Sequence, residues 1–281
     1  MELSTEWIEY RAGGEPVSAY RARPAETREP LPAVIVIQEV WGPDAHIQDV
    51  ADRLAAAGYL ALAPDLYSHG ARPPELEPDR IARAKGFLEG LPPAAWMDPA
   101  KRAEALAELP PREGGPIGET LASLLPAERP MDRYLAVLRA AVAFLREDPA
   151  VDGHVASIGF CLGGGLSALL ACEEPTLDAA VIFYGMSPAA ERVDGVACPV
   201  LGFYGAEDRR ITSGVAVLAA AMAEAGKDFE AVVYAGAPHA FLNDTRSSYR
   251  PAAARDAWAR TLAFLARMAP ARTVAPDAAN A

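Results

Sequence analysis

The sequence lacks the features that mark several large classes of protein. Its three cysteines, Cys161, Cys172 and Cys198, are too few and too irregularly spaced for a disulfide framework or a zinc site. No segment approaches the roughly 20 consecutive apolar residues of a membrane span. Residues 1–11 carry three glutamates and no apolar core of a secretory signal. We therefore expect a reduced, cytoplasmic protein that binds no metal.

Lysine and arginine are also outnumbered by acidic residues. The 281 residues include 26 Lys and Arg against 38 Asp and Glu, which gives a formal net charge of −12. An acidic surface of this kind disfavours nucleic acid and anionic membranes as partners. The composition, 51% hydrophobic and 23% charged, is that of an ordinary globular domain. We expect a monomer or homodimer whose partner is a small molecule, not a nucleic acid or a membrane.

The chain does contain a regular alternation of strands and helices. A hairpin is predicted from strands at 5–10 and 16–22, and residues 33–37 form an unbroken apolar run that is typical of a strand buried on both faces. Further strands are predicted at 59–63, 155–159, 178–183, 199–204 and 229–235, and helices at 44–57, 131–147, 163–172, 213–225 and 252–268. This alternation predicts a doubly wound, mostly parallel α/β sheet with helices on both faces.

The alternation is interrupted between about residues 70 and 130. This segment is rich in proline and turns, with short helices predicted near 79–90, 99–108 and 117–125. We interpret it as an insertion over the C-terminal ends of the strands, either a decoration or a lid that shapes a pocket. Residues 1–269 are then a single domain, and the small, polar segment 270–281 is predicted to be disordered.

A cysteine occupies the first of four motifs that carry chemistry. Gly159-Phe160-Cys161-Leu162-Gly163 follows a predicted strand and opens a predicted helix, which is the context of a nucleophile elbow. Glycines two residues before and after the nucleophile are needed because side chains there would collide with neighbouring backbone. The positive end of a helix also favours a thiolate. Cys161 is the candidate nucleophile, whereas Cys172 and Cys198 are expected to be core thiols.

Two further motifs supply a base and an acid. His239 follows the last predicted strand, where a general base for Cys161 is needed, and none of the other three histidines has that position. Asp208 follows the strand at 199–204 and is expected to orient the imidazole, with Glu207 beside it as a competing candidate. The order Cys161, Asp208, His239 is the nucleophile–acid–histidine order of α/β hydrolases.

The fourth motif, Gln38-Glu39-Val40-Trp41-Gly42, follows the first central strand. The backbone N–H groups of Val40 and Leu162 are predicted to form an oxyanion hole. A partly buried carboxylate near the thiol, at Glu39, is a candidate for controlling thiol ionisation. Taken alone, a residue such as Glu39 is more often an ordinary acid at the end of a strand.

Together these segments resemble the dienelactone hydrolase family of α/β hydrolases. The resemblance covers about residues 15–70 and 131–268, and its motifs are Val36–Gly42, Gly58–Tyr67, Gly159–Gly164, Gly205–Asp208 and Pro238–Phe241. It implies an α/β-hydrolase fold, a triad of Cys161, His239 and Asp208, and no cofactor. It also implies that Glu39 contacts the resting thiol until substrate displaces it, and that an acyl-enzyme forms and is hydrolysed by water.

The sequence departs from the family pattern at two positions. Where the family has two arginines that bind the carboxylate of an anionic dienelactone, this chain has His69 and Asn243, with Arg72 and Arg246 each three residues further on. An amide cannot replace the bidentate, charged contact of a guanidinium with a carboxylate. We therefore expect weak or no activity on dienelactone, and a different or neutral ester or lactone as substrate.

The leading prediction is a hydrolase that cleaves a carboxylic ester or lactone. The alternatives are a thioesterase or other acyl hydrolase with the same triad, a non-enzymatic binding protein that has kept the fold, and a redox-sensing role for the thiol. The side chains expected around the substrate pocket, some of which suit core packing equally well, are Trp41, Tyr67, His69, Arg72 and Phe241.

Overall fold

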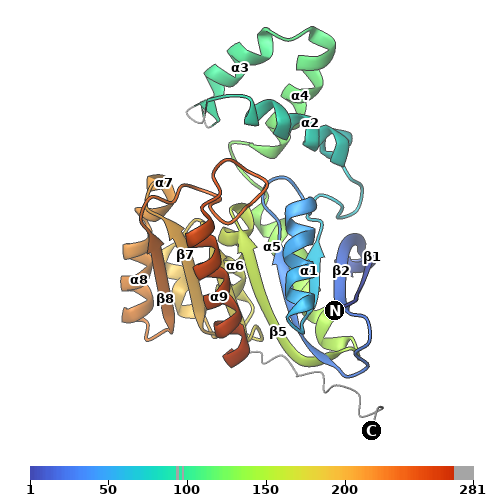
Figure 1. Cartoon of the computed structure of the whole chain (residues 1–281), viewed down its shortest axis with the longest axis vertical. Helices are drawn as coiled ribbons and strands as arrows, with labels where there is room; N and C mark the ends of the chain where they lie inside the picture. Colours follow the sequence, from blue (N-terminus) through green and yellow to red (C-terminus); the bar gives the residue numbers. More distant parts are fainter. Residues whose placement is uncertain (93–94, 97, 269–281) are drawn as a thin grey trace.

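An eight-stranded sheet runs through the centre of the molecule (Figure 1). The computed structural model describes residues 1–92, 95–96 and 98–268, so the predicted disordered segment 270–281 lies outside the described residues. In sheet order, the strands are β1 (Leu3–Ala12), β2 (Glu15–Pro24), β4 (Leu60–Pro64), β3 (Leu31–Ile37), β5 (Val151–Phe160), β6 (Ala179–Phe183), β7 (Val200–Gly205) and β8 (Phe229–Tyr234). The first two pairings are antiparallel and the others are parallel, which confirms the predicted α/β-hydrolase-type architecture.

Helices cover both faces of this sheet, as predicted. One apolar cluster joins the sheet to α1 (Ala45–Ala56) and α9 (Pro251–Met268). The other joins it to α5 (Met131–Glu147), α6 (Leu162–Glu173) and α8 (Val215–Glu224). The helix predicted at 213–225 is α8, and a short additional helix, α7 (Arg209–Thr212), precedes it. Short 3₁₀ turns, η1 (Pro74–Leu76) and η3 (Ala190–Gly195), complete the described elements.

Local sequence explains how the first crossover connection begins and ends. The side chain of Asp44 accepts a hydrogen bond from the Ile47 N–H at 3.3 Å and caps the N-terminus of α1. Gly58, with a φ of 95°, reverses the chain after the helix. All seven residues of β3 and all five of β4 are buried, as expected for central strands covered on both faces.

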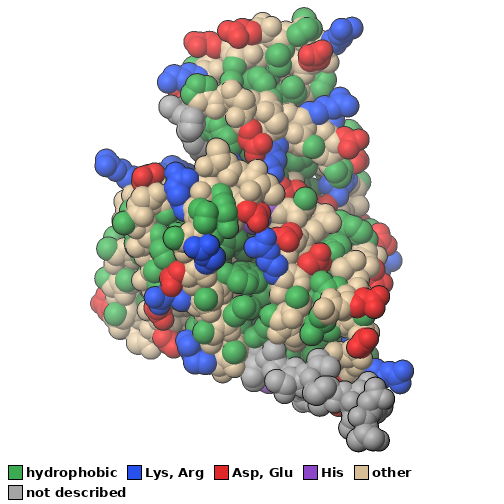
Figure 2. Space-filling view, viewed as in Figure 1, with side chains coloured by type: hydrophobic (Ala, Val, Ile, Leu, Met, Phe, Trp, Pro, Cys, Tyr) green, Lys and Arg blue, Asp and Glu red, His purple; other side chains and the backbone are tan. Residues whose placement is uncertain are grey.

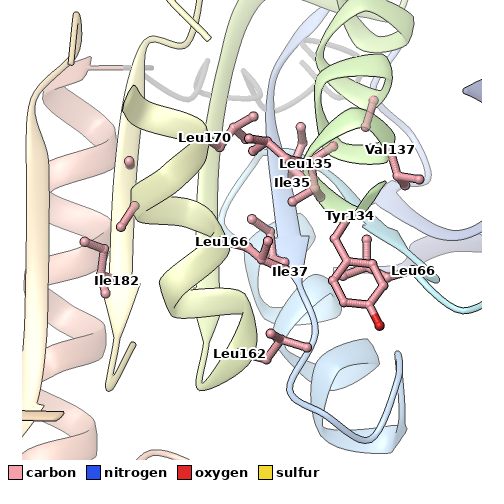
Figure 3. Close-up of a cluster of buried hydrophobic side chains, with 14 of the residues drawn as sticks. Ile35, Ile37, Leu66, Tyr134, Leu135, Val137, Leu162, Leu166, Leu170 and Ile182 are labelled. Carbon is pink, nitrogen blue, oxygen red and sulfur yellow. The ribbon is translucent and has the colours of Figure 1, made fainter. Parts of the chain in front are cut away.

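The larger apolar cluster lies between the sheet and helices α5 and α6 (Figure 3). Ile35 and Ile37 from β3 meet Leu135 from α5 and Leu166 from α6, and each of these side chains is at most 4% exposed. Leu162, at the start of α6, belongs to the same cluster. The core of the protein therefore extends to the edge of the sheet where the strands end.

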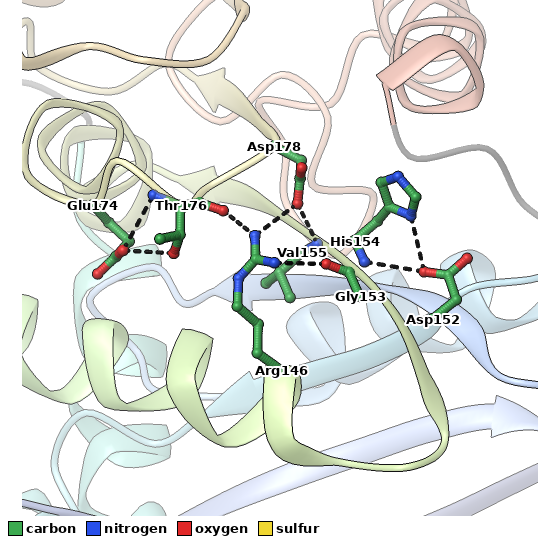
Figure 4. Close-up of polar contacts among 8 residues, drawn as sticks. All are labelled: Arg146, Asp152, Gly153, His154, Val155, Glu174, Thr176 and Asp178. Atoms are coloured by element: carbon green, nitrogen blue, oxygen red, sulfur yellow. Dashed lines mark hydrogen bonds and ion pairs between the residues drawn. The ribbon is translucent and has the colours of Figure 1, made fainter.

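The amino-terminal edge of the sheet is held by a polar network (Figure 4). Arg146, at the end of α5, donates to the carbonyl oxygen of Gly153 at 2.7 Å and pairs with Asp178 at 2.9 Å. Asp178 in turn accepts from the backbone N–H of Val155 at 2.8 Å. These contacts tie α5 to β5 and to the loop before β6, at the edge opposite the predicted chemistry.

The insertion forms a separate lobe above the carboxyl ends of the strands (Figures 1 and 2). It contains α2 (Pro78–Glu89), α3 (Pro99–Ala107) and α4 (Pro111–Leu124). The helix predicted near 117–125 begins earlier, at Pro111, so that Gly114 and Pro116 lie inside it. Gly114 is needed for packing: a Cβ there would lie 2.8 Å from the Leu106 carbonyl oxygen of α3.

Two ion pairs connect α2 of the insertion to the body. Lys85 Nζ of α2 lies 2.8 Å from Asp44 Oδ2, and Arg246 Nε, in the loop before α9, lies 3.7 Å from Glu89 Oε1. Figure 2 shows side chains of both charges spread over the outer surface of the lobe. No helix in the described parts of the chain has both the length and the apolarity needed to cross a bilayer.

Candidate active site

The sharp turn between β5 and α6 carries Cys161. This residue has a φ of 55° and a ψ of −110°, a conformation that is unusual for a residue with a side chain. A Cβ on Gly159 would lie 1.9 Å from the Gly163 carbonyl oxygen, and a Cβ on Gly163 would lie 2.2 Å from the Ile37 carbonyl oxygen. Both glycines are therefore required sterically, for the reason predicted from the sequence, and the thiol is held out at the sheet edge, partly exposed.

His239 and Asp208 meet at the same edge. His239 follows β8, Asp208 follows β7, and the distance from His239 Nδ1 to Asp208 Oδ2 is 2.5 Å. The Asp208 side chain is 9% exposed and that of His239 is 31% exposed. Glu207, the competing candidate, is exposed to solvent. The structure thus pairs the histidine with Asp208.

The imidazole of His239 also interacts with Cys161. Burial alone would lower the pKa of His239, but the charge of Cys161, and hydrogen bonds to Asp208 and Cys161, raise it from 6.5 to about 10. The imidazolium is therefore stabilised by two partners, the carboxylate of Asp208 and the sulfur of Cys161. Such a group can hold and deliver a proton beside the sulfur.

The loop after β3 is fixed beside the cysteine turn. The Gly163 N–H donates to the Gln38 carbonyl oxygen at 3.0 Å. The Tyr67 hydroxyl donates to the Val40 carbonyl oxygen at 2.8 Å. Val40, Leu162 and Cys161 line one cavity. The two residues predicted to supply oxyanion-hole N–H groups thus border the same cavity as the thiol, and the Tyr67 hydroxyl holds the loop through the Val40 carbonyl oxygen.

Glu39 is buried in this loop, with 1% of its surface exposed. Its Oε2 accepts a hydrogen bond from Asn243 Nδ2 at 3.1 Å. Its Oε1 has no hydrogen-bond partner among the described residues, although it is shielded from water. The asparagine that departs from the family pattern therefore binds a carboxylate of the protein itself, and the second carboxylate oxygen is left unpaired beside the cavity.

Tyr184 is a site residue that the sequence analysis missed. It follows β6 with a φ of 40°, is fully buried, and its ring contacts the His239 ring edge-on with centroids 5.1 Å apart. Burial, and the charges of Glu39 and Cys161, raise the pKa of Tyr184, so the hydroxyl stays neutral. Its oxygen has no hydrogen-bond partner within the described chain. Its position directly after a central strand, at the same edge as the motifs, was the signal available.

A cavity of about 1060 Å³ opens above these groups. It is lined by Glu39, Cys161, Asp208 and His239 from the sheet edge, and by Trp96 and Leu125 from the segment between residues 70 and 130. The insertion therefore contributes residues to the walls of this cavity. Trp41, an expected pocket residue, also lines it.

The other four expected pocket residues lie elsewhere, which corrects the prediction. Tyr67 and Phe241 are 3% and 0% exposed and belong to the core. His69 contacts the Ala12 carbonyl oxygen at 2.9 Å and accepts from Arg133. Arg72 pairs with Asp65. The sequence placed these residues near the correct strand ends, but it could not show which way each side chain points.

Comparison with known proteins agrees with this architecture. The chain matches the dienelactone hydrolase family over residues 17–269. A protein of Saccharolobus solfataricus, provisionally named a carboxymethylenebutenolidase, is 36% identical over 93% of this chain and 98% of its own length. One of Escherichia coli K12 with the same provisional name is 34% identical over 89% of this chain and 82% of its own.

A solved structure supports the same assignment. The crystal structure of a protein of Klebsiella pneumoniae, provisionally described as a dienelactone hydrolase, superposes with a TM-score of 0.72 at 32% identity, covering 95% of this chain and all of the other. The resemblance inferred from the motifs is therefore confirmed. The chain belongs to the dienelactone hydrolase family, carboxylic ester hydrolases built on the α/β-hydrolase fold.

Proposed function

We propose that this enzyme cleaves its ester or lactone through an acyl-enzyme on Cys161, with His239 and Asp208 as its partners. One observation carries the proposal: the His239 ring is paired with Asp208 at 2.5 Å and interacts with the sulfur of Cys161, inside a cavity large enough for a substrate. A nucleophile, a base and a group that orients the base are the minimum for covalent acyl transfer.

The reaction follows from this arrangement. The Cys161 thiolate attacks the carbonyl carbon while His239 holds the proton, and the carbonyl oxygen gains negative charge. The N–H groups of Val40 and Leu162 stabilise that oxygen. Collapse of the tetrahedral intermediate breaks the bond to the alcohol oxygen, which takes the proton from the imidazolium. Water, deprotonated by His239, then releases the acid and regenerates the thiol.

Glu39 is assigned a controlling role in this scheme. In the resting structure its Oε2 is held by Asn243 and its Oε1 is unpaired. Glu39 lines the cavity that Cys161 also lines, and we propose that its unpaired oxygen contacts the resting thiol until substrate displaces it. Asn243 keeps the carboxylate in place with a neutral amide. With Asn243 and His69 where family members have arginines, we propose a substrate other than dienelactone.

Hydrolysis of p-nitrophenyl acetate tests the nucleophile. Replacement of Cys161 by Ala should reduce kcat/KM by at least about a thousandfold, because the covalent route is lost. The matched control is Cys172→Ala, which removes a buried thiol on the same helix and should leave kcat/KM within about threefold. Equal rates for wild type and Cys161→Ala would contradict the proposal.

A further inference from the structure

The cavity is larger than the reacting groups require. Its volume of about 1060 Å³ lies just above the usual range for pockets that enclose drug-sized ligands. The sheet order gives it two sides. β3, which leads to Trp41, lies on one side of β5, which leads to Cys161, whereas β7 and β8, which lead to Asp208 and His239, lie on the other.

The side away from His239 is apolar. We call it the apolar arm, and its walls are Trp41, Leu88, Leu125, Met131, Leu135 and Leu162. Four of these side chains are at most 8% exposed and belong to the larger core cluster, while Leu125 and Met131 are partly buried against it. Charged residues also border this arm: Asp132 is exposed, Glu39 is buried, and the Arg129 guanidinium donates to the Leu124 carbonyl oxygen at 2.9 Å.

The side next to His239 has a different character. It is bordered by Arg192, Glu207 and Arg210, which are all exposed. Met186 also lines it and is 60% exposed. Ile211 also lines this side, but the charged side chains here are exposed to water, and we call it the polar side. It suits a group that must enter and leave.

The reaction determines which part of the substrate occupies which side. The alcohol oxygen must receive its proton from His239, so the leaving group lies on the polar side. The carbonyl oxygen points to the N–H groups of Val40 and Leu162. The remaining substituent on the carbonyl carbon, the acyl chain, is then directed into the apolar arm. This step rests on the proposed function.

Two of the charges near the site disfavour an anionic acyl chain. Arg246 acts electrostatically on Tyr184, so its charge reaches the site. Its guanidinium is already engaged, because it lies 4.4 Å from the centroid of the Trp96 ring and 3.7 Å from Glu89 Oε1, and its side chain is 12% exposed. The unpaired carboxylate oxygen of Glu39 also repels an anion.

We infer that the enzyme acts on esters with a neutral, apolar acyl group of about four to eight carbons, which the apolar arm binds beneath the insertion. The binding energy comes from removing methylene groups from water. Each buried methylene strengthens binding by about fourfold. A small polar or anionic acyl group would leave the arm unfilled or leave its own charge without a partner.

A series of p-nitrophenyl esters tests this inference with a constant leaving group. For the wild type, kcat/KM should be at least about tenfold higher for the hexanoate than for the acetate. The hexanoate should also exceed the mono-p-nitrophenyl ester of adipic acid, a chain of equal length that ends in a carboxylate, by at least about fivefold. Equal rates on acetate and hexanoate, or a faster adipate ester, would overturn the inference.

Two matched methionine variants test where the chain binds. Met131→Gln puts a polar group of similar size in the apolar arm and should lower the hexanoate-to-acetate ratio by at least about threefold. Met186→Gln makes the same change on the leaving-group side and should leave this ratio unchanged, whatever it does to both rates. A ratio that is unchanged in Met131→Gln, in protein that melts like the wild type, would overturn the assignment of the arm.

These outcomes separate the inference from the proposed function. If the wild type forms an acyl-enzyme on Cys161 from the acetate but shows no preference for longer chains, the inference fails and the proposed function stands. If no ester acylates Cys161, both fail.

Discussion

The cysteine turn and the insertion above it are held in place in different ways. At the turn, backbone lies against backbone, and a single added Cβ on Gly159 or Gly163 would approach a carbonyl oxygen to 1.9 or 2.2 Å. The insertion is joined to the body by side chains, including the ion pair of Lys85 with Asp44. The turn should therefore tolerate few substitutions, whereas residues in the walls of the cavity can be substituted without disturbing the turn. Substitutions in the two regions should differ accordingly.

The largest effect is expected at the pair of His239 and Asp208. Asp208→Asn keeps the shape of the side chain but removes the charge that orients and stabilises the imidazolium. We expect kcat/KM for a p-nitrophenyl ester to fall by about three to four orders of magnitude. Glu207→Gln, the same change at the neighbouring exposed residue, is the control and should alter kcat/KM less than about threefold. A similar loss in both variants would argue against Asp208 as the partner.

The next largest effect should come from the turn itself. Gly163→Ala forces backbone apart and should lower the free energy of unfolding by about 3 kcal/mol or more. Gly165→Ala, two residues along the same helix, is the matched control because the nearest atom to its Cβ lies at 3.5 Å. That variant should be within about 0.5 kcal/mol of the wild type. Chemical denaturation measures both, and equal stabilities would contradict the steric account.

A pH-dependent effect should follow from His239. Because folding raises its pKa from 6.5 to about 10, the imidazolium contributes stability that is fully present below pH 6.5 and is lost as the pH rises through about 10. We expect this effect to be smaller than that of Gly163→Ala, because the side chain is 31% exposed and solvent screens its charge.

Denaturation at several pH values checks this expectation. The stability difference between wild type and His239→Gln should shrink between pH 6.5 and pH 10. The same difference measured in a Cys161→Ser background should shrink less, since the charge of Cys161 is one cause of the raised pKa. A difference that stays constant over this range would show that the imidazolium is not stabilised in the folded protein.

The smallest effect is expected in the insertion. Lys85→Ala removes the ion pair with Asp44, whose two side chains are 18% and 22% exposed. The free energy of unfolding should fall by about 1 kcal/mol or less, and kcat/KM for p-nitrophenyl acetate should change by less than about threefold. Lys101→Ala, which removes an exposed pair with Asp98 within the insertion, is the control. A large loss of activity in Lys85→Ala alone would mean that the turn depends on the insertion.

The difference between the cysteine turn and the insertion also explains which features could be predicted from the sequence. Cys161, Asp208 and His239 each follow a strand that the apolar pattern identified, and the carboxyl ends of parallel strands meet at one edge of a sheet. Their convergence could therefore be predicted without coordinates. The choice between Asp208 and Glu207 could not, because both follow β7 and the local sequence does not show which one turns towards the histidine.

Local sequence patterns could not predict contacts between segments that are far apart in the chain. Arg246 lies against Trp96, although about 150 residues separate them, and no sequence period links the two. Tyr67 and Phe241 were expected around the pocket because they stand beside motifs, yet both face the core. Aromatic side chains suit either environment, so the pattern could not decide. Tyr184 was missed because no motif surrounds it, although it lies directly after a strand that was predicted.

The most direct test of this account is to identify the atom that carries the acyl group. Wild-type enzyme mixed with a p-nitrophenyl ester and quenched in acid within milliseconds should gain the mass of one acyl group. Peptide mass spectrometry should place that mass on Cys161, and the variant Cys161→Ala should gain none. An acyl group on any other residue, or turnover without a covalent intermediate on Cys161, would contradict the account.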